Sequence, residues 1–488
     1  MEKRDLKPTG VFSYFEEICQ VPRPSKKEEK IIAYLKAFGE KHKLETKVDE
    51  AGNVLIKKPA TPGKEKLKTV VLQSHIDMVC EKNNDVVHDF MKDPILTEIE
   101  GDWLKAKGTT LGADNGIGVA TELAILADDT IEHGPLECLF TVDEETGLTG
   151  AFALKEGFMS GDILLNLDSE DEGELYIGCA GGMDSVGTLL YKEIEVPAGY
   201  FFFKVQVKGL KGGHSGGDIH LGRGNANKIL NRFLNKLIVK YGSQFYLSEI
   251  DGGNLRNAIA REAFAVFALP ESEKHEVRTS LNIFTSEIED ELLAIEPDIK
   301  IILESESSRK YAFDQDTTGR LIKILYAMPH GVYAMSKDIP DLVETSNNLA
   351  SVKMKEGNTI RIETSQRSSI LSARDDMANT VRAIFTLGGA TVSFGSGYPG
   401  WKPDPHSAIL EVAKESYVRL FGTVPQVKAI HAGLECGLFL EKYPHLDMIS
   451  FGPTLTGVHS PDERLLIPTV DKYWKHLLDI LVNVPENN

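Results

Sequence analysis

Residues 70–78 read Val-Val-Leu-Gln-Ser-His-Ile-Asp-Met, an apolar run that ends in His75 and Asp77. The nearly continuous apolar character predicts a strand that is buried on both faces, as in the parallel sheets of α/β proteins. In an extended segment, residues i and i+2 point to the same side, so His75 and Asp77 share a face. The sequence therefore predicts that a central strand delivers a histidine and a carboxylate to one edge of its sheet.

Two further apolar runs end in acidic residues in the same way. Residues 136–142 lead into Glu144 and Glu145, and residues 162–167 lead into Asp168. The carboxyl ends of parallel strands meet at one edge of an open α/β sheet, which is where such sheets bind their ligands. These strand ends are therefore expected to place their side chains around a common site.

Two more side chains of the same kind lie in glycine-containing turns. Asp114 belongs to Leu-Gly-Ala-Asp-Asn-Gly-Ile-Gly at 111–118, which opens an expected helix, and His459 lies in a Gly-Val-His-Ser loop. Each residue alone has an ordinary structural interpretation, because a carboxylate is a good helix N-cap and loop histidines are common. Together, imidazoles and carboxylates without a thiolate favour zinc, cobalt or manganese. The sequence thus predicts a paired metal site formed by His75, Asp114, Glu145, Asp168 and His459.

The composition is that of a soluble globular enzyme. Of 488 residues, 42% are hydrophobic and 26% are charged, and 54 Lys plus Arg against 73 Asp plus Glu give a net charge of −19. That balance argues against a nucleic acid or an anionic membrane as a partner. We expect no signal peptide and no membrane span. Five scattered cysteines without a Cys-x-x-Cys pair predict a reducing compartment, the cytoplasm.

Periodicity predicts the local structure of several segments. Residues 26–43 are expected to form an amphipathic helix with Ser25 as its N-cap, and residues 225–241 another helix. A strand is expected near 257–267, after a glycine-rich loop at 209–217. These segments differ in pattern before and after about residue 185, which indicates more than one domain, as the length of the chain also does.

The domains are expected to be 1–185, 186–394 and 395–488. The strand–helix–strand pattern appears twice in the middle segment, which indicates a duplicated α/β unit. His459 can rejoin the N-terminal residues only if this middle segment is inserted into a discontinuous domain. The expected fold class is therefore α/β, with a central mixed sheet flanked by helices in the first and last segments.

The chain resembles the zinc metallopeptidases related to aminoacylase and carboxypeptidase G. Within them it is most similar to the branch of dipeptidases that act on aminoacyl-histidine peptides, in which Asn115 follows the aspartate of the turn where other members often have a second acid. The resemblance covers essentially the whole chain and rests on Ser-His75-Ile-Asp77-Met, Gly-Ala-Asp114-Asn115-Gly-Ile-Gly, Asp-Glu144-Glu145-Thr-Gly, Leu-Asp168-Ser-Glu, Gly-Gly-His214-Ser-Gly-Gly-Asp, His431-Ala-Gly-Leu-Glu435-Cys-Gly and Gly-Val-His459-Ser.

The resemblance implies a dinuclear zinc site, in which cobalt or manganese can substitute. Asp114 would bridge two zinc ions, His75 and Asp168 would hold one of them, and Glu145 and His459 the other. Each ion would then have three protein ligands and an open position for water, as a catalytic zinc requires. The peptide bond after Asp114 would be cis, and the middle segment would be an α+β lid or dimerisation domain.

The resemblance also implies the roles of further residues. Glu144 would be the general base towards the metal-bound water, and Asp77 would orient His75 through its second ring nitrogen. His214 would be an oxyanion donor that arrives on domain closure or from a partner subunit. The residues that would contact the substrate are Asn257, Arg367 and Glu435.

The activity implied by the resemblance is hydrolysis of dipeptides, Xaa-His such as β-alanyl-histidine among them, by a homodimeric enzyme. The alternative enzyme is an N-acyl amino acid amidohydrolase, which would use the same metals. A metal-stabilised binding protein without catalysis is disfavoured, because a structural site would not need Glu144.

Overall fold

The computed structural model describes residues 6–487, which form two compact units. The first unit comprises the described chain up to Cys179, Trp401–Ala429 and the chain from Leu434 onward, and the second comprises Ala180–Gly400 with Ile430–Gly433. The domain boundaries predicted from the sequence stay a prediction. The prediction placed residues 430–433 in the last segment, whereas the structure places them in the second unit. No feature of the sequence marks this short segment.

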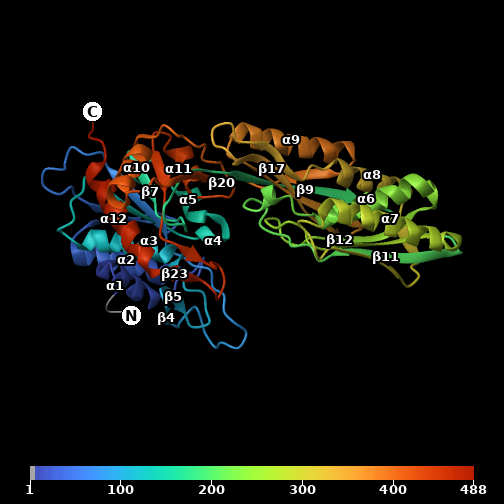
Figure 1. The fold of residues 1–488 in the computed structure, drawn as a ribbon, viewed down its shortest axis with the longest axis horizontal. Coiled ribbons are helices and arrows are strands. Elements are labelled where there is room, and N and C mark those ends of the chain that lie inside the picture. Colours follow the sequence, from blue (N-terminus) through green and yellow to red (C-terminus); the bar gives the residue numbers. More distant parts are fainter. Residues whose placement is uncertain (1–5, 488) are drawn as a thin grey trace. The chain divides into compact units, whose positions relative to one another are not determined.

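The first unit is built on a mixed sheet with helices around it (Figure 1). The strand order is β1-β2-β6-β3-β7-β21-β8-β20. The central strands β6, β3, β7 and β21 are parallel, and β1, β2 and β8 pair antiparallel. This arrangement confirms the predicted α/β class with a central mixed sheet. The strands are β1 (Glu45–Val48), β2 (Val54–Lys58), β3 (Val70–His75), β6 (Leu136–Thr141), β7 (Ile163–Asn166), β8 (Glu174–Cys179), β20 (Gln426–Ile430) and β21 (Asp447–Ser450).

Helices cover this sheet, and the burial of its strands follows from that cover. Every residue of β3, β6 and β7 is buried, as the apolar runs predict. Helix α3 packs against β3 and α1, and α10 packs against β21 and α12. The helices are α1 (Thr9–Cys19), α2 (Glu29–His42), α3 (Ala113–Ala127), α4 (Glu144–Gly147), α5 (Thr149–Ala153), α10 (Ala408–Phe421), α11 (Cys436–Lys442) and α12 (Ile467–Asn483).

A small second sheet of the first unit joins chain segments that are far apart in sequence. Its order is β22-β23-β5-β4, with antiparallel pairing throughout. The C-terminal hairpin thereby lies beside strands from the N-terminal segment, and the loop that carries His459 connects its two strands. The strands are β4 (Thr97–Glu100), β5 (Trp103–Ala106), β22 (Leu455–Thr456) and β23 (Arg464–Leu466).

The second unit has a nine-stranded antiparallel sheet with the order β14-β11-β13-β12-β17-β18-β9-β19, in which β16 also pairs with β17. A separate two-stranded sheet pairs β10 (Glu193–Glu195) with β15 (Tyr311–Phe313). Four helices pack on the larger sheet (Figure 1). The core of this unit includes Phe203, Phe233 and Phe267. The elements are β9 (Gly181–Leu190), β11 (Tyr200–Lys208), α6 (Ala226–Tyr241), β12 (Tyr246–Gly252), β13 (Ala263–Pro270), α7 (Lys274–Leu292), β14 (Lys300–Ser305), α8 (Gln315–Ala327), β16 (Gly331–Met335), β17 (Val343–Lys355), β18 (Thr359–Ser368), α9 (Leu371–Leu387) and β19 (Thr391–Phe394).

The topology of this sheet repeats. In one half β11, α6, β12, β13, α7 and β14 follow one another, and the strands lie in the order fourth, first, third, second. The other half repeats this order with β9, α8, β17, β18, α9 and β19. Each half is a β-α-β-β-α-β unit. The first strand of the second half precedes the whole first half in sequence, so the repeat has no simple sequence period.

Two local predictions are wrong. Helix α2 begins at Glu29 without a side-chain cap, because the hydroxyl of Ser25 instead donates to Asp77 Oδ2 at 2.7 Å. The strand predicted at 257–267 begins only at Ala263, since residues before it form a loop that pairs with the 213–215 segment. Within residues 6–487, no helix combines the length and the apolar character that crossing a bilayer requires.

Candidate functional site

The predicted ligands of the first unit lie at one edge of its sheet. His75 is the last residue of β3, Asp168 follows the end of β7, and Glu145 lies in the short helix α4 that follows β6. Asp114 is at the start of α3, where its own backbone is extended rather than helical, and the peptide bond to Asn115 is cis. The parallel strands thus bring these side chains together, as expected from their shared direction.

The carboxylate of Asp114 lies between two histidines. Its Oδ1 is 3.0 Å from Nε2 of His75, and its Oδ2 is 3.2 Å from Nε2 of His459. Each histidine has one further carboxylate of its own: Nε2 of His75 is 3.4 Å from Asp168 Oδ1, and Nε2 of His459 is 3.0 Å from Glu145 Oε2. The five side chains therefore form two sets of three that share Asp114.

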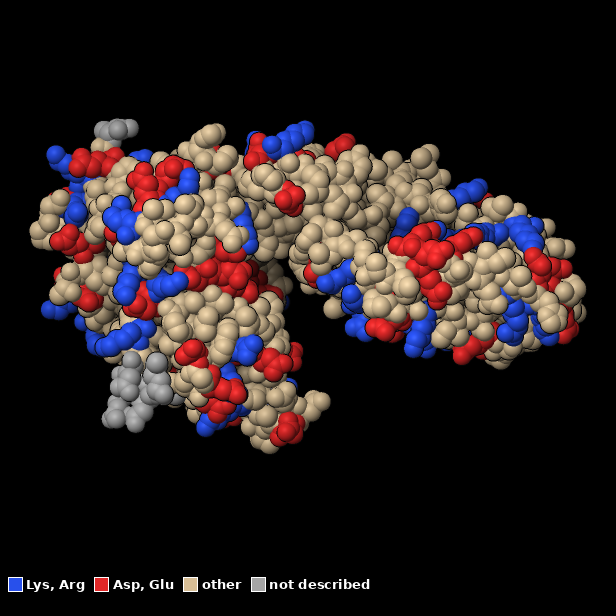
Figure 2. All heavy atoms as spheres, in the orientation of Figure 1, with Lys and Arg blue, Asp and Glu red and all other residues tan. Residues whose placement is uncertain are grey.

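The site is buried and crowded with acids. Asp114 and Glu145 raise the pKa of His459 to about 11. Burial raises the pKa of Asp168 to about 6 and, with the charges of Asp114 and Asp168, that of Glu170 to about 8. Figure 2 shows a band of Asp and Glu side chains across the face of the first unit that carries α4. Carboxylates this close repel one another, so the site favours protons or cations.

The donor set suits a divalent metal ion. One ligand atom from each of His75, Asp114 and Glu145 lies within 4.8 Å of the others, which allows a single ion to reach all three. Glu145 Oε1 is buried and has no hydrogen-bond partner among the described residues. A buried acceptor is normally satisfied, and a cation would satisfy this one. The side chain of His459 is 53% exposed, which leaves its side of the site open to solvent.

Asp77 supports this site. Its Oδ1 is 3.3 Å from Nδ1 of His75 and accepts the backbone N–H of Glu144 at 3.1 Å, while its Oδ2 accepts that of Glu145 at 3.3 Å. These donors, with Ser25, hold the pKa of Asp77 below its usual range although burial raises it. Both oxygens are thus engaged by His75 and the α4 backbone, which favours an orienting role over direct metal ligation.

Two further acids face the site. Burial raises the pKa of Glu144 well above its usual range, and the nearby carboxyl groups of Asp168 and Glu435 raise it further against the effect of His75. Glu435 is 1% exposed, and its Oε2 accepts from Gln73 at 2.6 Å and Thr141 at 2.8 Å. Its Oε1 is buried without a hydrogen-bond partner among the described residues, and burial raises its pKa to about 7.

His214 belongs to the second unit, in the loop after β11. Its Nδ1 accepts the backbone N–H of Gly217 at 3.0 Å and that of Gly216 at 3.3 Å. Burial and the charge of Arg367 lower the pKa of His214 to about 4, so the imidazole is neutral near pH 7. A neutral ring that accepts at Nδ1 carries its proton on Nε2. His214 therefore presents a fixed N–H donor.

Arg367 lies in the same unit, on β18, and is 7% exposed. It donates to Tyr398 Oη at 2.9 Å and to Ser215 Oγ at 3.4 Å, and no carboxylate among residues 6–487 forms an ion pair with it. Burial and the charge of Arg367 lower the pKa of the neighbouring His431 to about 3, so this imidazole is neutral near pH 7. A buried, unpaired guanidinium is a strong site for a carboxylate.

Asn257 lies in an exposed loop of the second unit, and its backbone rather than its side chain makes the recorded contacts. Its carbonyl accepts the N–H of Ser215 at 2.8 Å, and Asn348 Nδ2 donates to the carbonyl of Ala258 at 2.9 Å. The loop of Asn257 is thereby fixed to the loop of His214. The side chain of Asn257 stays a predicted substrate contact.

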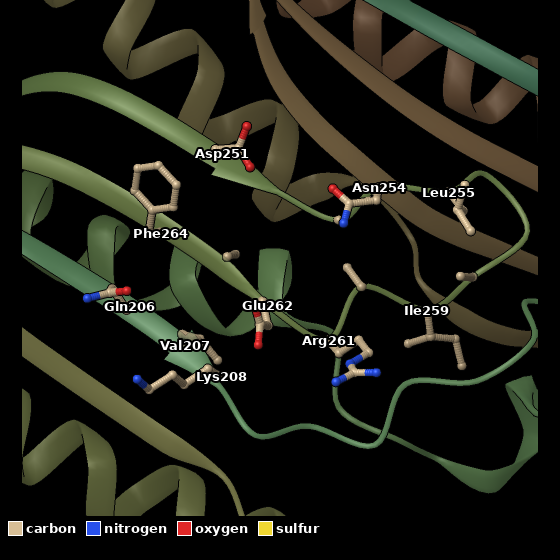
Figure 3. Close-up of a pocket in the computed structure, with 14 residues that line it drawn as sticks. Gln206, Val207, Lys208, Asp251, Asn254, Leu255, Ile259, Arg261, Glu262 and Phe264 are labelled. Atoms are coloured by element: carbon tan, nitrogen blue, oxygen red, sulfur yellow. The ribbon is translucent and has the colours of Figure 1, made fainter. Parts of the chain in front are cut away.

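A pocket of about 440 Å³ in the second unit contains none of the predicted site residues. It lies beside the ends of β11, β12 and β13, and Figure 3 shows Gln206, Lys208 and Phe264 from these strands around it. Its acid Asp251 is paired with Lys353 at 2.7 Å. The charges of its lining are mixed and no buried polar group is directed into it by any recorded contact, so we assign it no function.

Sequence reasoning missed three charged residues of the first unit. Glu170 belongs to an acidic run after Asp168 that is typical of a solvated segment, but it is only partly exposed and lies beside the predicted ligands. Arg23 and Glu463 contact the turn of Asp114, and each is 2% exposed. An acid in an acidic run gives no sign of burial, and the contacts of the other two span more than 50 residues of sequence.

Comparisons with known proteins show the family and the fold of the chain. The model of the family "Peptidase family M20/M25/M40" matches residues 71–483. The "Cytosol non-specific dipeptidase" of Escherichia coli (strain K12) is 45% identical over 486 residues, which are 99% of each chain. The crystal structure of aminoacylhistidine dipeptidase from Vibrio alginolyticus matches 100% of this chain and 99% of its own, with 46% identity and a TM-score of 0.92.

A more distant structure shares the fold. Aminopeptidase PepT from Bacillus cereus matches with a TM-score of 0.56 over 98% of each chain, at 16% identity. Similarity at this level describes the architecture of the chain.

Metal binding to the acidic site should stabilise the folded protein. After chelator treatment, zinc, cobalt or manganese at 100 times its Kd should add about 2.7 kcal/mol to the free energy of unfolding, because the ion binds only the folded site. Thermal unfolding with and without metal measures this. Asp114→Asn should lose most of the shift, whereas Glu50→Gln, on an exposed ion pair with Lys155, should keep it. Equal shifts in both variants would place the metal elsewhere.

Proposed function

Because the chain belongs to peptidase family M20/M25/M40, we propose that it is a metal-dependent dipeptidase that cleaves dipeptides with a free amino group, Xaa-His peptides among them. The observation that carries this proposal is the position of Asp114, whose two oxygens each face a histidine with a further carboxylate. The printed activities of the two relatives that match the full chain support the dipeptide substrate.

We propose that two divalent ions, zinc with cobalt or manganese as substitutes, bind here. His75 and Asp168 would hold one ion, Glu145 and His459 the other, and Asp114 both. Such a pair of ions, when bound, supplies an activated water and polarises the scissile carbonyl. Imidazole and carboxylate ligands suit all three metals, so the native one is a matter for measurement.

Glu144 would act as the general base. It lies beside Asp77, which accepts its backbone N–H, and its carboxyl group is surrounded by other acids. A base must be deprotonated, and the raised pKa of Glu144 would return towards its usual range once cations offset those neighbouring charges. Glu144 would then take a proton from the attacking water and pass it to the leaving amine.

Residues of the second unit would bind two groups of the substrate, the scissile carbonyl and the C-terminal carboxylate. The Nε2–H of His214 would donate to the carbonyl oxygen as it gains negative charge, within one chain or across two. Arg367 would receive the C-terminal carboxylate of the dipeptide, with Asn257 contacting its backbone. In the first unit, the unsatisfied Oε1 of Glu435 would accept from the free amine of the substrate.

We also propose that the enzyme works in the cytoplasm as a homodimer. Cys80, Cys138, Cys179 and Cys436 are free thiols, which suits a reducing compartment, and the relative from Escherichia coli is named a cytosol enzyme.

A dipeptide panel tests the proposed activity. Protein reconstituted with zinc, cobalt or manganese should cleave unblocked dipeptides such as β-alanyl-histidine and leave their N-acetyl forms largely intact, because the amine site expects a free amino group. Chelated protein should lose activity and regain it with metal. Preference for the N-acetyl forms would instead identify an N-acyl amino acid amidohydrolase, and full activity without metal would refute the mechanism.

Glu144→Gln and Glu145→Gln separate the two adjacent glutamates. Glu144→Gln removes the proposed general base, so kcat should fall by roughly 10²–10⁴-fold while metal content stays at the wild-type level. Glu145→Gln should instead weaken metal binding, since it removes a charged ligand from one of the two sets. Metal analysis and kinetics on both variants measure the difference. A metal-free Glu144→Gln beside a metal-replete Glu145→Gln would mean that the two roles are reversed.

Arg367→Lys tests the carboxylate site. A lysine cannot make the two parallel hydrogen bonds of a guanidinium, so kcat/KM for dipeptides should fall about 10–100-fold, the equivalent of 1.5–3 kcal/mol for a charged hydrogen bond. Dipeptide amides, which lack the carboxylate, should be cleaved equally by both proteins. Arg374→Lys is the matched control, because Arg374 also contacts Tyr398 but is paired with Asp375. Equal losses for dipeptides and their amides would remove the carboxylate role.

A further inference from the structure

The turn that carries Asp114 is held by one buried carboxylate. Glu463 Oε2 accepts the backbone N–H groups of Leu111 at 2.8 Å and Gly112 at 2.9 Å, and its Oε1 accepts those of Ala113 at 2.8 Å and Asp114 at 3.3 Å. Four successive amides thus point at a side chain that is 2% exposed. This arrangement fixes the direction of the backbone up to Asp114 itself.

A buried arginine holds the carbonyl side of the same turn. Arg23 Nη2 donates to the carbonyl of Gly112 at 2.5 Å, and its Nη1 donates to those of Ile76 at 3.2 Å and Asp77 at 3.0 Å. The guanidinium therefore connects the turn of Asp114 to the segment that directly follows His75. Glu463 thus bonds to the amides of the Asp114 turn, and Arg23 bonds to one carbonyl of that turn and to two carbonyls beside His75.

The glycines of this turn make room for Arg23. Gly112 has a φ of +67°, and a Cβ there would lie 2.6 Å from Arg23 Nη2. A Cβ at Gly116 would also lie 2.6 Å from that atom. A side chain at either position would displace the guanidinium, so the two glycines around Asp114 leave the space that Arg23 occupies.

Glu463 also fixes the loop of the second histidine. Its backbone N–H donates to the carbonyl of Ser460 at 3.0 Å, one residue after His459, and β23 begins at the next residue, Arg464. The loop from Gly457 to Glu463 is compact, because Gly457 has a φ of +69° and the carbonyl of Asp462 leaves no room for a side chain there. Glu463 thus couples the loop of His459, through its backbone, to the turn of Asp114, through its side chain.

We propose that Glu463 and Arg23 are positioning residues that set the Asp114 carboxylate between His75 and His459. The inference rests on the proposed function for its metal ions and goes beyond it in naming what holds the shared ligand. Neither side chain is placed among the ligands. Groups that orient metal ligands typically contribute 10–100-fold to metal affinity, which is the size of effect expected here.

Glu463→Gln is the main test. The amide keeps the size of the side chain but turns an NH2 group towards two backbone N–H groups, so those two hydrogen bonds are lost. Equilibrium dialysis with metal analysis should give a 10–100-fold weaker Kd for at least one of two ions. The visible absorption of the cobalt-loaded protein should change as well, because it reports the geometry of the ligands rather than the stability of the fold.

Glu296→Gln is the matched control. Glu296 is 0% exposed and accepts the backbone N–H groups of Lys211 at 2.8 Å and Gly224 at 3.0 Å, in the second unit. The Glu296→Gln protein should also lose stability, because backbone hydrogen bonds to a buried carboxylate are lost, while its metal affinity and its cobalt spectrum stay unchanged. If Glu463→Gln is destabilised in the same way but keeps wild-type metal affinity and spectrum, Glu463 is only structural and the proposal is wrong.

Arg23→Lys provides a second route if Glu463→Gln does not fold. A lysine reaches fewer of the three carbonyls but keeps the charge. The Kd and the cobalt spectrum should therefore change in the same direction as in Glu463→Gln, by a smaller amount. An unchanged spectrum and Kd in Arg23→Lys would contradict the proposal for Arg23. The wild-type protein separates the two levels of inference: two bound ions without hydrolysis of any dipeptide would refute the proposed function and leave the positioning role standing.

Discussion

The carboxylate of Asp114, held between two imidazoles, is the contact on which the rest of the first unit depends. It contacts His75 at the end of a central strand and His459 in a C-terminal loop, which lies 345 residues after Asp114 in the sequence. Only a chain that returns after the second unit can close that contact. The parallel strands, the C-terminal hairpin beside β5 and the buried charges around the turn all bring this one carboxylate to its place.

Strand ends made much of the site predictable. A buried parallel strand is an apolar run, and its last residues face the ligand edge, so His75, Glu145 and Asp168 could be assigned to one place from their sequence context alone. The structure brings them together with Asp114 and His459. The mixed α/β sheet followed from the same runs. The five side chains were predicted as metal ligands from their chemistry and position in the sequence, and their division between two ions came from the resemblance.

Side chains whose partners are distant in sequence escaped prediction. Ser25 precedes a helix and is of a residue type that often caps helices, yet its hydroxyl donates to Asp77, 52 residues away. Arg23 and Glu463 bond to backbone groups, which leave no complementary residue in the sequence to find. Glu170 was hidden for the opposite reason, since the acids around it suggested solvent. In each case tertiary contacts decided the outcome over local preference.

Buried acids make the unloaded site costly for the fold, and this has a structural consequence. Desolvation and mutual repulsion raise the pKa of Asp168, Glu170 and Glu435, so their charged forms oppose folding until a cation or a proton offsets them. A turn held only by its own ligands would open under that repulsion whenever metal left. Burial and the charge of Asp114 raise the pKa of Glu463 too, but the four backbone N–H groups that it accepts act against this rise, and Arg23 holds the carbonyl side of the turn. If these two residues position Asp114 as proposed, the binding energy of the ion is not needed to order that carboxylate.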